Sequence, residues 1–432
     1  MSRAPSLRVE CEAIQSVHPS GLLRPAPARW APGSGSRNDI RILTFTTLFP
    51  NTQQPAHGVF VENRLVHLVA SGQVASRVVA PVPWFPFGHR AFGEYAAFAK
   101  VATSEERRGL AIHHPRFPVI PKVGMSVQAG LLYLATRRYV RRMIAESGDI
   151  DLIDAHYFYP DGVAAALLGR TLKRPVVITA RGTDVSLIPQ FELPRRQVLW
   201  AARQAAGLIT VCQALKDALV DLGVDAGRIR VLRNGVDLAR FRPLPRDEAR
   251  RRWDVTGPTL LSVGLLIPRK GHDIVIGALP ELPGMSLLIV GAGPERNTLE
   301  RLAASLGVAE RVRFLGVLTQ DELAEVYGAV DMLVLASSRE GWANVLLESM
   351  ACGTPVVASD IWGNGEVVAE PAAGRLFMPR TASALALAIR RLSAALPDRA
   401  ATRAYAERFS WDATTGGQIS LFRDILEGGA PA

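Results

Sequence analysis

The chain has 432 residues, 48% of them hydrophobic and 21% charged, which is typical of a globular protein with two large domains or three small ones. Its 50 Lys and Arg against 40 Asp and Glu give a net charge of +10, which favours anionic partners such as nucleotide phosphates or an acidic membrane surface. We expect no nucleic acid partner, because the chain has no recognition motif and no interleaving of aromatic with basic residues.

The first 38 residues are punctuated by Pro, Arg and Ser and lack the apolar core of a signal peptide. No stretch of the sequence reaches the ~18 consecutive apolar residues of a membrane span. Cys11, Cys212 and Cys352 lie far apart and in no metal or redox spacing, which fits a reducing compartment. We therefore expect residues 1–38 to be a disordered leader and the protein to be cytoplasmic, with the inner face of the cell membrane as an alternative location.

From residue 39 onward, strand-like and helix-like runs alternate, which predicts a parallel sheet covered by helices on both faces. The predicted strands of this first series are IRILTF (40–45), SRVVA (76–80), DLIDAH (151–156), PVVITA (175–180), LITV (208–211) and RIRVL (228–232). The predicted helices between them lie near 59–71, 126–146, 161–172, 194–205 and 213–222.

The same alternation then repeats. Its predicted strands are TLLSVG (259–264), MSLLIVG (285–291), RVRFLG (311–316), DMLVLA (331–336) and TPVVAS (354–359), with helices near 271–279, 295–306, 320–328 and 344–352. Asn234–Asp237 and the Pro- and Arg-rich stretch 241–253 have the turn chemistry of a linker. The predicted fold class is α/β, with two Rossmann-like, doubly wound parallel-sheet domains at 39–240 and 241–405 that face a cleft. A helix at 406–432 follows, and it could cross back to the N-terminal domain.

Several polar residues follow strands of the first series, at the edge where doubly wound sheets bind ligands. Residues 46–58 form a long loop that ends at Gly58 and could approach a donor phosphate or an acceptor. His156 closes one strand, and Arg181 and Asp184 follow the next. We predict that these three face the cleft, with a structural hydrogen-bonding role as the alternative for His156.

Asp149 and Asp151 have the D-x-D spacing of a metal site, but they stand at the amino end of a strand, opposite the expected ligand edge. We interpret them as charge at the start of the strand and predict no metal ligands.

The predicted helix near 128–145 carries Arg137, Arg138, Arg141 and Arg142 beside apolar residues, which makes a basic amphipathic stripe. The segment WFPF (84–87) adds aromatic residues. Together they would allow peripheral docking on an anionic membrane; the alternative is an apolar stripe that faces the core.

A glycine turn follows the first strand of the second series and delivers two cations to the start of a helix. It begins at Gly264 and carries Arg269 and Lys270, which could neutralise a leaving diphosphate without a metal. The alternative is a solvated Arg–Lys pair on a loop. After the next strand, Gly291 and Gly293 lack a Cβ and would let a nucleobase or ribose approach the backbone.

The most informative stretch contains two glutamates, Glu340 and Glu348, with seven residues between them. Glu340 lies on a strand-to-helix loop, and Glu348 lies about one turn inside an apolar helix, where a carboxylate needs a partner. A ribose diol would offer Glu348 two hydroxyl donors. The backbone N–H groups at the helix start would face a diphosphate, and they belong to Gly341, Trp342, Ala343, Asn344 and Val345. The alternative is an N-terminal charge followed by a salt-bridged core glutamate.

These residues together resemble the family 4 retaining glycosyltransferases of the GT-B fold, over nearly all of 39–425. The E-x7-E pair is the specific part, and it is supported by VGLLIPRKG (263–271), IVGAGPE (289–295), FLG (314–316), NGVD (234–237) and ACGTPVV (351–357). The segments DAHYFYPDG (154–162) and ITARGTD (178–184) look like the branch typified by teichuronic acid biosynthesis enzymes.

The resemblance implies a metal-independent transferase that moves a sugar from a UDP- or GDP-sugar to a polysaccharide or lipid-linked glycan, with no cofactor besides this co-substrate. It places Glu340 on the sugar hydroxyls, Glu348 on the ribose and Lys270 on the diphosphate, and it implies no side-chain nucleophile. It also implies that the amino-terminal domain holds the acceptor, which puts His156, Arg181 and Asp184 on the acceptor side. Two positions depart from the family pattern. Leu265 stands where an Arg is common, a lost cation that Arg269 could replace, and Arg181 stands where a His is common.

Two other functions remain open. A nucleotide-sugar epimerase or hydrolase on the same fold would consume the donor without an acceptor. A non-catalytic nucleotide-binding or scaffolding protein would bind the donor without consuming it, but the intact Glu340, Glu348 and Lys270 argue against that function.

Overall fold

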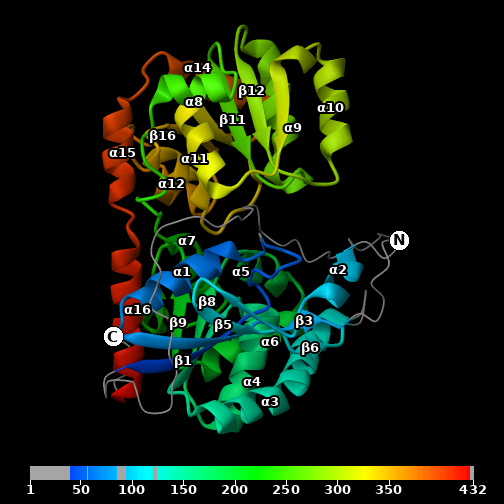
Figure 1. Cartoon of the computed structure of the whole chain (residues 1–432), viewed down its shortest axis with the longest axis vertical. Coiled ribbons are helices and arrows are strands. Elements are labelled where there is room, and N and C mark those ends of the chain that lie inside the picture. Colours follow the sequence, from blue (N-terminus) through cyan, green and yellow to red (C-terminus); the bar gives the residue numbers. More distant parts are fainter. Residues whose placement is uncertain (1–38, 56, 85–93, 120–123, 429–432) are drawn as a thin grey trace. The chain divides into compact units, whose positions relative to one another are not determined.

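The computed structural model describes residues 39–55, 57–84, 94–119 and 124–428, and the chain divides into two compact units (Figure 1). In the described ranges, unit 1 runs from residue 39 to Leu232 and again from Thr414, and unit 2 runs from Arg233 to Ala413. The terminal helix α16 (Trp411–Leu426) therefore belongs to unit 1 for most of its length. The contact boundaries fall somewhat before residue 240 and after residue 405, because Asn234 and Phe409 pack on Trp342 of unit 2.

Unit 1 is built on a sheet in the order β10-β9-β8-β7-β1-β2-β5-β4. Its strands are β1 (Ile40–Phe45), β2 (Val74–Val79), β4 (Ser104–Arg107), β5 (Leu110–His113), β7 (Leu152–His156), β8 (Val176–Ala180), β9 (Gly207–Thr210) and β10 (Ile229–Val231). A separate pair joins β3 (Val82–Pro83) to β6 (Arg116–Phe117).

The sheet of unit 1 is not purely parallel, which corrects the prediction. β4 runs antiparallel to β5, and the two are joined by Arg108 and Gly109, whose φ values of 50° and 78° suit a two-residue hairpin turn. The charged residues of β4 lie at the edge of the sheet, where exposed backbone is commonly flanked by charges. Their polarity is why the sequence pattern did not predict this strand.

Helices cover the sheet of unit 1. α1 (Val59–Ala70) and α16 share one buried apolar cluster with the strands, in which Leu65 and Phe422 pack with Ile42 and Ile209. α3 (Gln128–Ser147) packs on α4 (Val163–Leu172), which packs on α6 (Glu192–Gln204). The remaining helices are α2 (Glu94–Lys100), α5 (Thr183–Ser186) and α7 (Gln213–Asp221). In the described part of the chain, no helix is both long enough and apolar enough to cross a bilayer.

Unit 2 has a fully parallel sheet in the order β13-β12-β11-β14-β15-β16. Its strands are β11 (Thr259–Val263), β12 (Ser286–Val290), β13 (Val312–Gly316), β14 (Met332–Leu335), β15 (Val356–Ser359) and β16 (Gly374–Phe377). Counted within the unit, this is the order 3-2-1-4-5-6 of dinucleotide-binding sheets, which reverses between β11 and β14.

The helices of unit 2 form two layers. α9 (His272–Ala278), α10 (Arg296–Ser305) and α14 (Ala382–Ser393) share a buried cluster with the strands, including Val275, Leu299 and Ile389. α11 (Gln320–Ala329) and α12 (Asn344–Ala351) contact each other, and α8 (Arg246–Arg252) and α15 (Arg399–Glu407) pack against them. α13 (Asn364–Val367) is a short helix after β15. Each predicted strand and helix of both series is present, with bounds that differ by a few residues.

Candidate active site

The loops that leave β11 and β14 are bonded to each other at the point where the strand order of unit 2 reverses. The N–H of Ser338 donates to the carbonyl of Arg269 over 2.8 Å. The guanidinium of Arg269 donates to the carbonyl of Arg339 over 2.9 Å. Ligands of doubly wound sheets bind outside the carboxyl ends of the strands at this reversal, so the two loops form the expected ligand edge.

Three charged side chains cluster on these loops. Lys270 Nζ lies 2.7 Å from Glu340 Oε1, and an Arg269 guanidinium nitrogen lies 3.8 Å from Oε2. Burial alone would raise the pKa of Glu340, but the charges of Lys270 and Arg269 outweigh it and hold that pKa below its ordinary value. Lys270 and Arg269, predicted at the diphosphate, and Glu340, predicted at the sugar, thus form one ionic cluster around a buried, ionised carboxylate, and they are the candidate catalytic residues.

Gly271 allows the two loops to come this close. Its φ is 70°, and a Cβ at this position would lie 2.1 Å from the carbonyl oxygen of Ala336, the residue after β14. Arg380 donates its Nε to the same carbonyl over 2.7 Å. The sequence analysis did not identify Arg380, because it follows β16, a strand that was itself not predicted.

His272 holds the β11 loop from the inside. Its Nε2 donates to the carbonyl of Leu265 over 3.2 Å, so its Nδ1 accepts from the hydroxyl of Ser262 at 2.9 Å. Burial lowers the pKa of His272 to about 4, which keeps the ring neutral. The sequence around His272 carries no pattern that distinguishes this role from that of a surface histidine.

Glu348 lies on α12, and the hydroxyl of Tyr327 on α11 donates to its Oε2 over 3.1 Å. Both side chains are buried. Burial raises the pKa of Tyr327 well above its ordinary value, so the phenol remains a donor. A carboxylate inside an apolar helix needs a partner. For Oε2 of Glu348, Tyr327 is that partner.

The residues at the start of α12 are anchored by the segment that enters unit 2. The indole Nε1 of Trp342 donates to the carbonyl of Asn234 over 3.1 Å. The Asn234 side chain donates to Asn344 Oδ1 over 3.4 Å. Trp342 and Ala343 are buried, whereas Asn344 and Val345 are partly exposed. Two residues of the segment from Gly341 to Val345 are thus bonded to Asn234, and the last two residues of the segment are partly exposed.

The glycines after β11 and β12 serve the contact between their own loops. A Cβ on Gly293 would lie 2.4 Å from the carbonyl oxygen of Leu266. The glycine therefore lets the backbone of Leu266 approach where a larger residue would clash. Gly264 lies against the side chain of Lys270, whose Cδ would be 3.3 Å from an added Cβ. Gly291, with a φ of 143°, turns the chain at the end of β12.

In unit 1 the strand order reverses between β1 and β7, and Asp161 occupies this position. Its carboxylate accepts from the Thr47 N–H at 2.7 Å, from the Thr47 hydroxyl at 3.0 Å and from the Thr46 hydroxyl at 3.1 Å. Burial raises the pKa of Asp161 to about 7. The sequence analysis missed this residue; the available signal was a carboxylate at the start of an apolar helix.

The loop after β1 also folds back on itself. His57 Nε2 donates to the carbonyl of Thr47 over 2.9 Å. Gly58, predicted to approach a donor phosphate, lies against the loop backbone, where a Cβ would be 2.3 Å from the carbonyl oxygen of Leu48. Its φ of 73° and this contact give Gly58 a role in closing the loop.

The three residues predicted on the acceptor side form one bonded group. Arg181 donates to His156 Nδ1 over 2.8 Å. Asp184 accepts the backbone N–H groups of Phe158, Arg181 and Gly182, at 2.8, 3.1 and 2.7 Å. Burial lowers the pKa of His156 to about 4, so the ring is neutral and can accept from Arg181. Both Asp184 and His156 are engaged with the protein, and they hold Arg181 through its backbone and its side chain.

Two family models match this chain. The model described as Glycosyltransferase Family 4 matches residues 71–240, and the model described as Glycosyl transferases group 1 matches residues 245–409. A D-inositol 3-phosphate glycosyltransferase of Acidothermus cellulolyticus is 36% identical over 313 residues, which cover 65% of this chain and 68% of that protein. This chain belongs to the family 4 glycosyltransferases. A second relative of this glycosyltransferase, the D-inositol 3-phosphate glycosyltransferase of Salinispora arenicola, is 31% identical over 324 residues, 66% of this chain and 71% of the relative.

Solved structures share the fold of this glycosyltransferase. Sucrose-phosphate synthase from Thermosynechococcus elongatus superimposes with a TM-score of 0.71 at 22% identity, covering 90% of this chain and 100% of that one. Anabaena HepE, solved in complex with UDP, gives a TM-score of 0.66 at 23% identity, covering 88% and 98%. The predicted fold class, a GT-B enzyme with Rossmann-like α/β domains, is confirmed.

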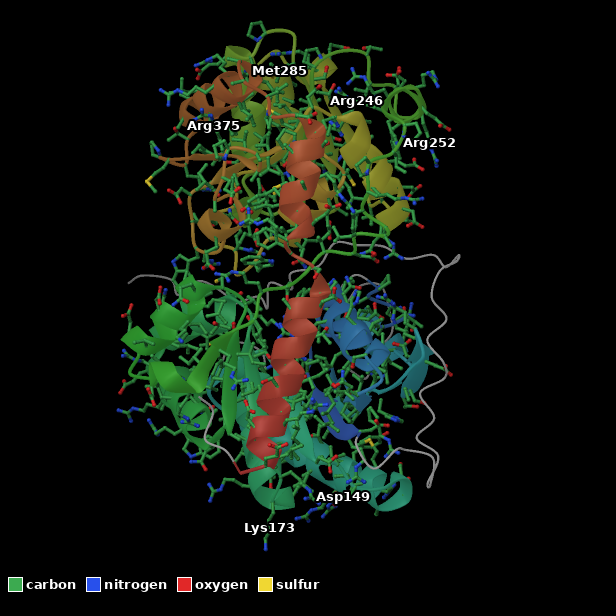
Figure 2. All side chains as sticks on the ribbon, turned by 90° about the vertical axis from the view of Figure 1, so that its left-hand side faces the viewer. Asp149, Lys173, Arg246, Arg252, Met285 and Arg375 are labelled. Atoms are coloured by element: carbon green, nitrogen blue, oxygen red, sulfur yellow. The ribbon has the colours of Figure 1, made fainter. Side chains whose placement is uncertain are left out.

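The D-x-D sequence of the glycosyltransferase is charge at the start of β7, as interpreted. Asp151 pairs with Arg41 at 2.7 Å, and Asp149 pairs with Arg174. Figure 2 shows Asp149 and Lys173 at one end of unit 1, where β7 and β8 begin. In the four described ranges, no three His, Cys, Asp or Glu side chains are grouped to hold a metal ion.

The basic stripe on α3 turns its apolar side to the core. Leu132, Val140 and Met143 are buried, while Arg138, Arg141 and Arg142 are exposed. Leu134 is 51% exposed and Trp84 is 57% exposed. Residues 85–87 of the predicted aromatic segment lie outside the described ranges.

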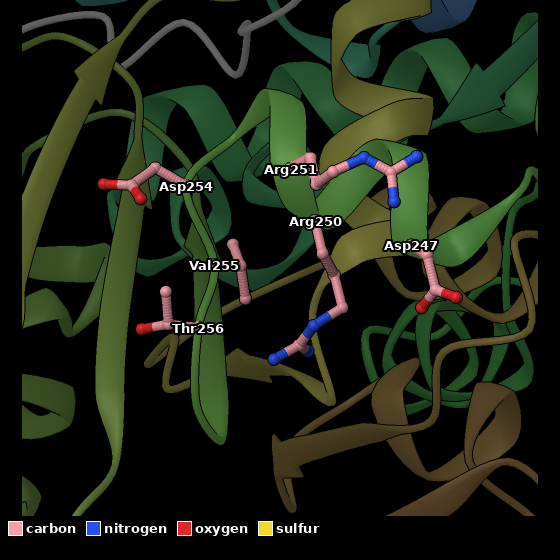
Figure 3. A pocket seen from close by; sticks show the side chains of 6 residues that line it. All are labelled: Asp247, Arg250, Arg251, Asp254, Val255 and Thr256. Carbon is pink, nitrogen blue, oxygen red and sulfur yellow. The ribbon is translucent and has the colours of Figure 1, made fainter.

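A pocket of about 450 Å³ opens on unit 2 near the beginning of β11 (Figure 3). It is lined by Asp247, Arg250, Arg251, Asp254, Val255 and Thr256. Arg250 donates to the carbonyls of Ala329 and Gly257 over 3.1 and 2.9 Å, so its charge supports the backbone. Because it adjoins the amino end of β11, this pocket is separate from the ionic cluster at the carboxyl end.

Proposed function

We propose that the enzyme is a retaining, metal-independent transferase that moves a sugar from a UDP- or GDP-sugar to a polysaccharide or lipid-linked glycan acceptor. The observation that carries the proposal is the cluster of Lys270, Arg269 and Glu340 at the reversal of strand order in unit 2. Two cations and one carboxylate leave a net positive charge at the edge where a parallel sheet of this order binds nucleotides.

The two cations have a direct role in the chemistry. When the bond from the anomeric carbon to the phosphate oxygen breaks, negative charge develops on the diphosphate, and fixed positive charge stabilises it. An ammonium has three N–H donors, so Lys270 can bond to Glu340 and to a diphosphate oxygen together. Arg269, close to Glu340 at 3.8 Å, supplies the second charge in place of the cation that the family commonly carries at position 265.

The carboxylates orient the donor. Glu340 accepts from sugar hydroxyls, and Glu348 accepts from the ribose, with its Oε2 held in place by Tyr327. The N–H groups of Gly341 to Val345 at the start of α12 face the diphosphate. Retention follows from attack on the same face that the phosphate leaves: the acceptor oxygen bonds to the anomeric carbon, and the departing phosphate oxygen takes its proton. Positioning and charge then carry the rate.

Arg181 is the acceptor-side residue, and His156 and Asp184 act through it. The teichuronic-type segments 154–162 and 178–184 support a glycan acceptor. D-inositol 3-phosphate, for which the relatives are named, is a second candidate acceptor, and its phosphate would suit the Arg181 guanidinium. The exposed arginines of α3 would bring the enzyme to anionic lipids at the inner face of the cell membrane.

The first experiment measures the thermal stability of the protein with a panel of UDP-, GDP- and ADP-sugars in the presence of EDTA. One nucleotide sugar should raise Tm in the wild type and in the matched control Arg251→Ala, an exposed cation of the Figure 3 pocket. Glu348→Ala and Lys270→Ala should lose the shift. A shift that requires a divalent cation, or no shift with any donor, would contradict the proposal.

Product analysis then separates the alternatives. Transfer to an acceptor supports the proposal, and an anomeric product of the same configuration as the donor supports retention. Consumption of the donor without an acceptor would indicate an epimerase or hydrolase. Binding without consumption would indicate a nucleotide-binding protein.

A further inference from the structure

The terminal helix α16 contributes a buried amide to unit 1, next to the group that holds Arg181. Gln418 is 1% exposed, and its Nε2 donates to Asp154 Oδ2 over 2.9 Å. Its Oε1 accepts from Arg64 Nε at 2.8 Å. Asp154 is a fully buried residue in the middle of β7, and Arg64 lies on α1. One amide therefore joins three elements that are far apart in the sequence.

The bonds continue from Asp154 to Arg181. His156 Nε2 lies 3.3 Å from Asp154 Oδ2, and His156 Nδ1 accepts from Arg181 at 2.8 Å. Since Arg181 can only donate, Nδ1 carries no proton, so the neutral ring has its proton on Nε2 and donates it to Asp154. On the other side, Arg64 donates to the carbonyl of Leu232 over 3.1 Å. The Gln418 amide donates to Asp154 and accepts from Arg64, and these two bonds fix its orientation.

At the other end of these hydrogen bonds, two contacts fix the position of the Arg181 guanidinium. Arg181 is 3% exposed, and its Cζ lies 5.3 Å from the centroid of the Phe60 ring, at the start of α1. His156 and Phe60 together restrict the side chain, and His156 is itself oriented by Asp154. A change at Gln418 would take the side-chain acceptor from Arg64 Nε and leave Asp154 Oδ2 with His156 alone, a loss that low-dielectric surroundings make costly.

We propose that Gln418 is a positioning residue of the acceptor half: through Asp154 and His156 it sets the guanidinium of Arg181, so that the last helix of the chain is part of the acceptor machinery. The acceptor role rests on the proposed function; the link from Gln418 to His156 does not.

The test replaces the amide by a side chain of similar volume that cannot form hydrogen bonds, Gln418→Met. The matched control is Ile419→Ala, the next residue of α16, which is 4% exposed in the apolar cluster and takes no part in the polar series. Both variants weaken the packing of the helix. Only the first removes a donor from Asp154.

The first readout is the titration of His156 in the full-length protein, followed by the ¹⁵N shifts of its imidazole. The charged groups that face this ring are Asp154 of β7, Arg181 after β8 and Arg64 of α1. When Asp154 loses the Gln418 donor, it stabilises a protonated His156 more strongly, so the midpoint should rise by about one pH unit in Gln418→Met. Ile419→Ala should titrate as the wild type does.

A second variant keeps the test decisive if Gln418→Met fails to fold. Gln418→Glu retains an acceptor for Arg64 and adds a negative charge beside Asp154, so it should raise the His156 midpoint further. An unchanged midpoint in the folded variants, or an equal change in Ile419→Ala, would overturn the link between Gln418 and His156.

The second readout is steady-state transfer from the donor found in the panel to D-inositol 3-phosphate as the acceptor probe. We expect Gln418→Met to raise the acceptor KM by about tenfold and to leave the donor KM unchanged, since a misplaced guanidinium weakens acceptor contacts alone. A moved His156 titration with an unchanged acceptor KM would overturn the acceptor role. Absence of transfer to this probe in the wild type, with His156 still responding to Gln418, would count against D-inositol 3-phosphate as the acceptor and not against the link between Gln418 and His156.

Discussion

Both units carry a buried carboxylate at the reversal of strand order, but the two carboxylates are balanced in different ways. In unit 2, Glu340 faces the cations of Lys270 and Arg269, which lower its pKa. In unit 1, Asp161 accepts from hydroxyl and N–H donors of Thr46 and Thr47, and burial raises its pKa to about 7. The same topological position is therefore a cluster of charged side chains in unit 2. In unit 1 it is a carboxylate that holds a loop in place through hydrogen bonds.

This contrast follows from what each loop delivers. The segment after β11 brings two cations back towards the sheet, whereas the segment after β1 brings two threonines. Cations make a site that can exchange partners with a diphosphate, while neutral donors hold one carboxylate in place. In unit 1, a buried arginine, Arg181, follows β8, the strand next to β7 in the sheet.

The largest effect is expected from Lys270→Ala, which removes the cation that makes the unit 2 position a charged site. We expect kcat to fall by about 10²–10³-fold, as for the loss of one charge-stabilising donor at a reacting centre. Steady-state transfer assays measure this change, and Arg251→Ala serves as the control for loss of a surface cation. A fall of less than about tenfold would place the charge stabilisation elsewhere.

Gly271→Ala tests the close contact between the loops that follow β11 and β14 in unit 2. The added Cβ would clash with the carbonyl oxygen of Ala336 at 2.1 Å and would sit at a φ of 70°. We expect a loss of about 3 kcal/mol or more in the free energy of unfolding. Gly307→Ala is the matched control, because Gly307 has a φ of 66° and nothing within 4 Å of the added Cβ. It should cost about 1 kcal/mol. Equal losses in urea denaturation would show that the contact with Ala336 is unimportant.

Asp161→Asn tests whether the hydrogen bonds of Asp161 with Thr46 and Thr47 make the stability of the protein depend on pH. The pKa of Asp161 is about 7 in the folded protein against an ordinary value of 3.8, so the folded state binds the proton more tightly. The stability from this group is present below pH ~4 and is lost as pH rises to about 7. The wild type should therefore lose stability relative to Asp161→Asn across this range, with a slope of at most about 1.4 kcal/mol per pH unit.

The measurement is the difference in unfolding free energy between the two proteins from pH 4 to pH 8. The difference isolates Asp161, because the other titrating groups are shared. A difference that does not change with pH would show that Asp161 has an ordinary pKa.

The smallest effect is expected from Tyr327→Phe, which removes the hydroxyl that holds Glu348. The free energy of unfolding should fall by about 1 kcal/mol, and affinity for the nucleotide sugar should fall with it. Tyr405→Phe is the control: that hydroxyl donates to the carbonyl of Val367 over 2.9 Å in the same unit. Calorimetry should show weaker donor binding in the first variant only.

Most of the fold was predictable from hydrophobic periodicity, because a buried parallel strand and an amphipathic helix each leave a local pattern. The strands that were missed have weak local signals. They are β3 and β6, with two residues each, β4, with charges at three of its four residues, and β5 and β16, with four residues each. Their assignment depends on pairing, of β3 with β6, of β4 with β5 and of β16 with β15, and pairing partners are not visible in a single stretch of sequence.

The candidate site was predictable to the extent that chemistry follows strands. Arg269, Lys270 and Glu340 were identified because they stand after β11 and β14, and Arg181 because it stands after β8. Asp161, Tyr327, Arg380 and Gln418 were not identified. Their partners are supplied by other elements, so the role of each side chain becomes visible only when those elements are placed beside it.

The amino-acid order was thus sufficient to define which residues lie at the ends of strands, and it made this chain recognisable as a glycosyltransferase. Tertiary structure was needed to pair them: Lys270 with Glu340 across 70 residues, and Gln418 with Asp154 across 264. The physical reason is that periodicity and turn chemistry act over a few residues, whereas strand order and the return of the last helix depend on burying apolar faces contributed by the whole chain.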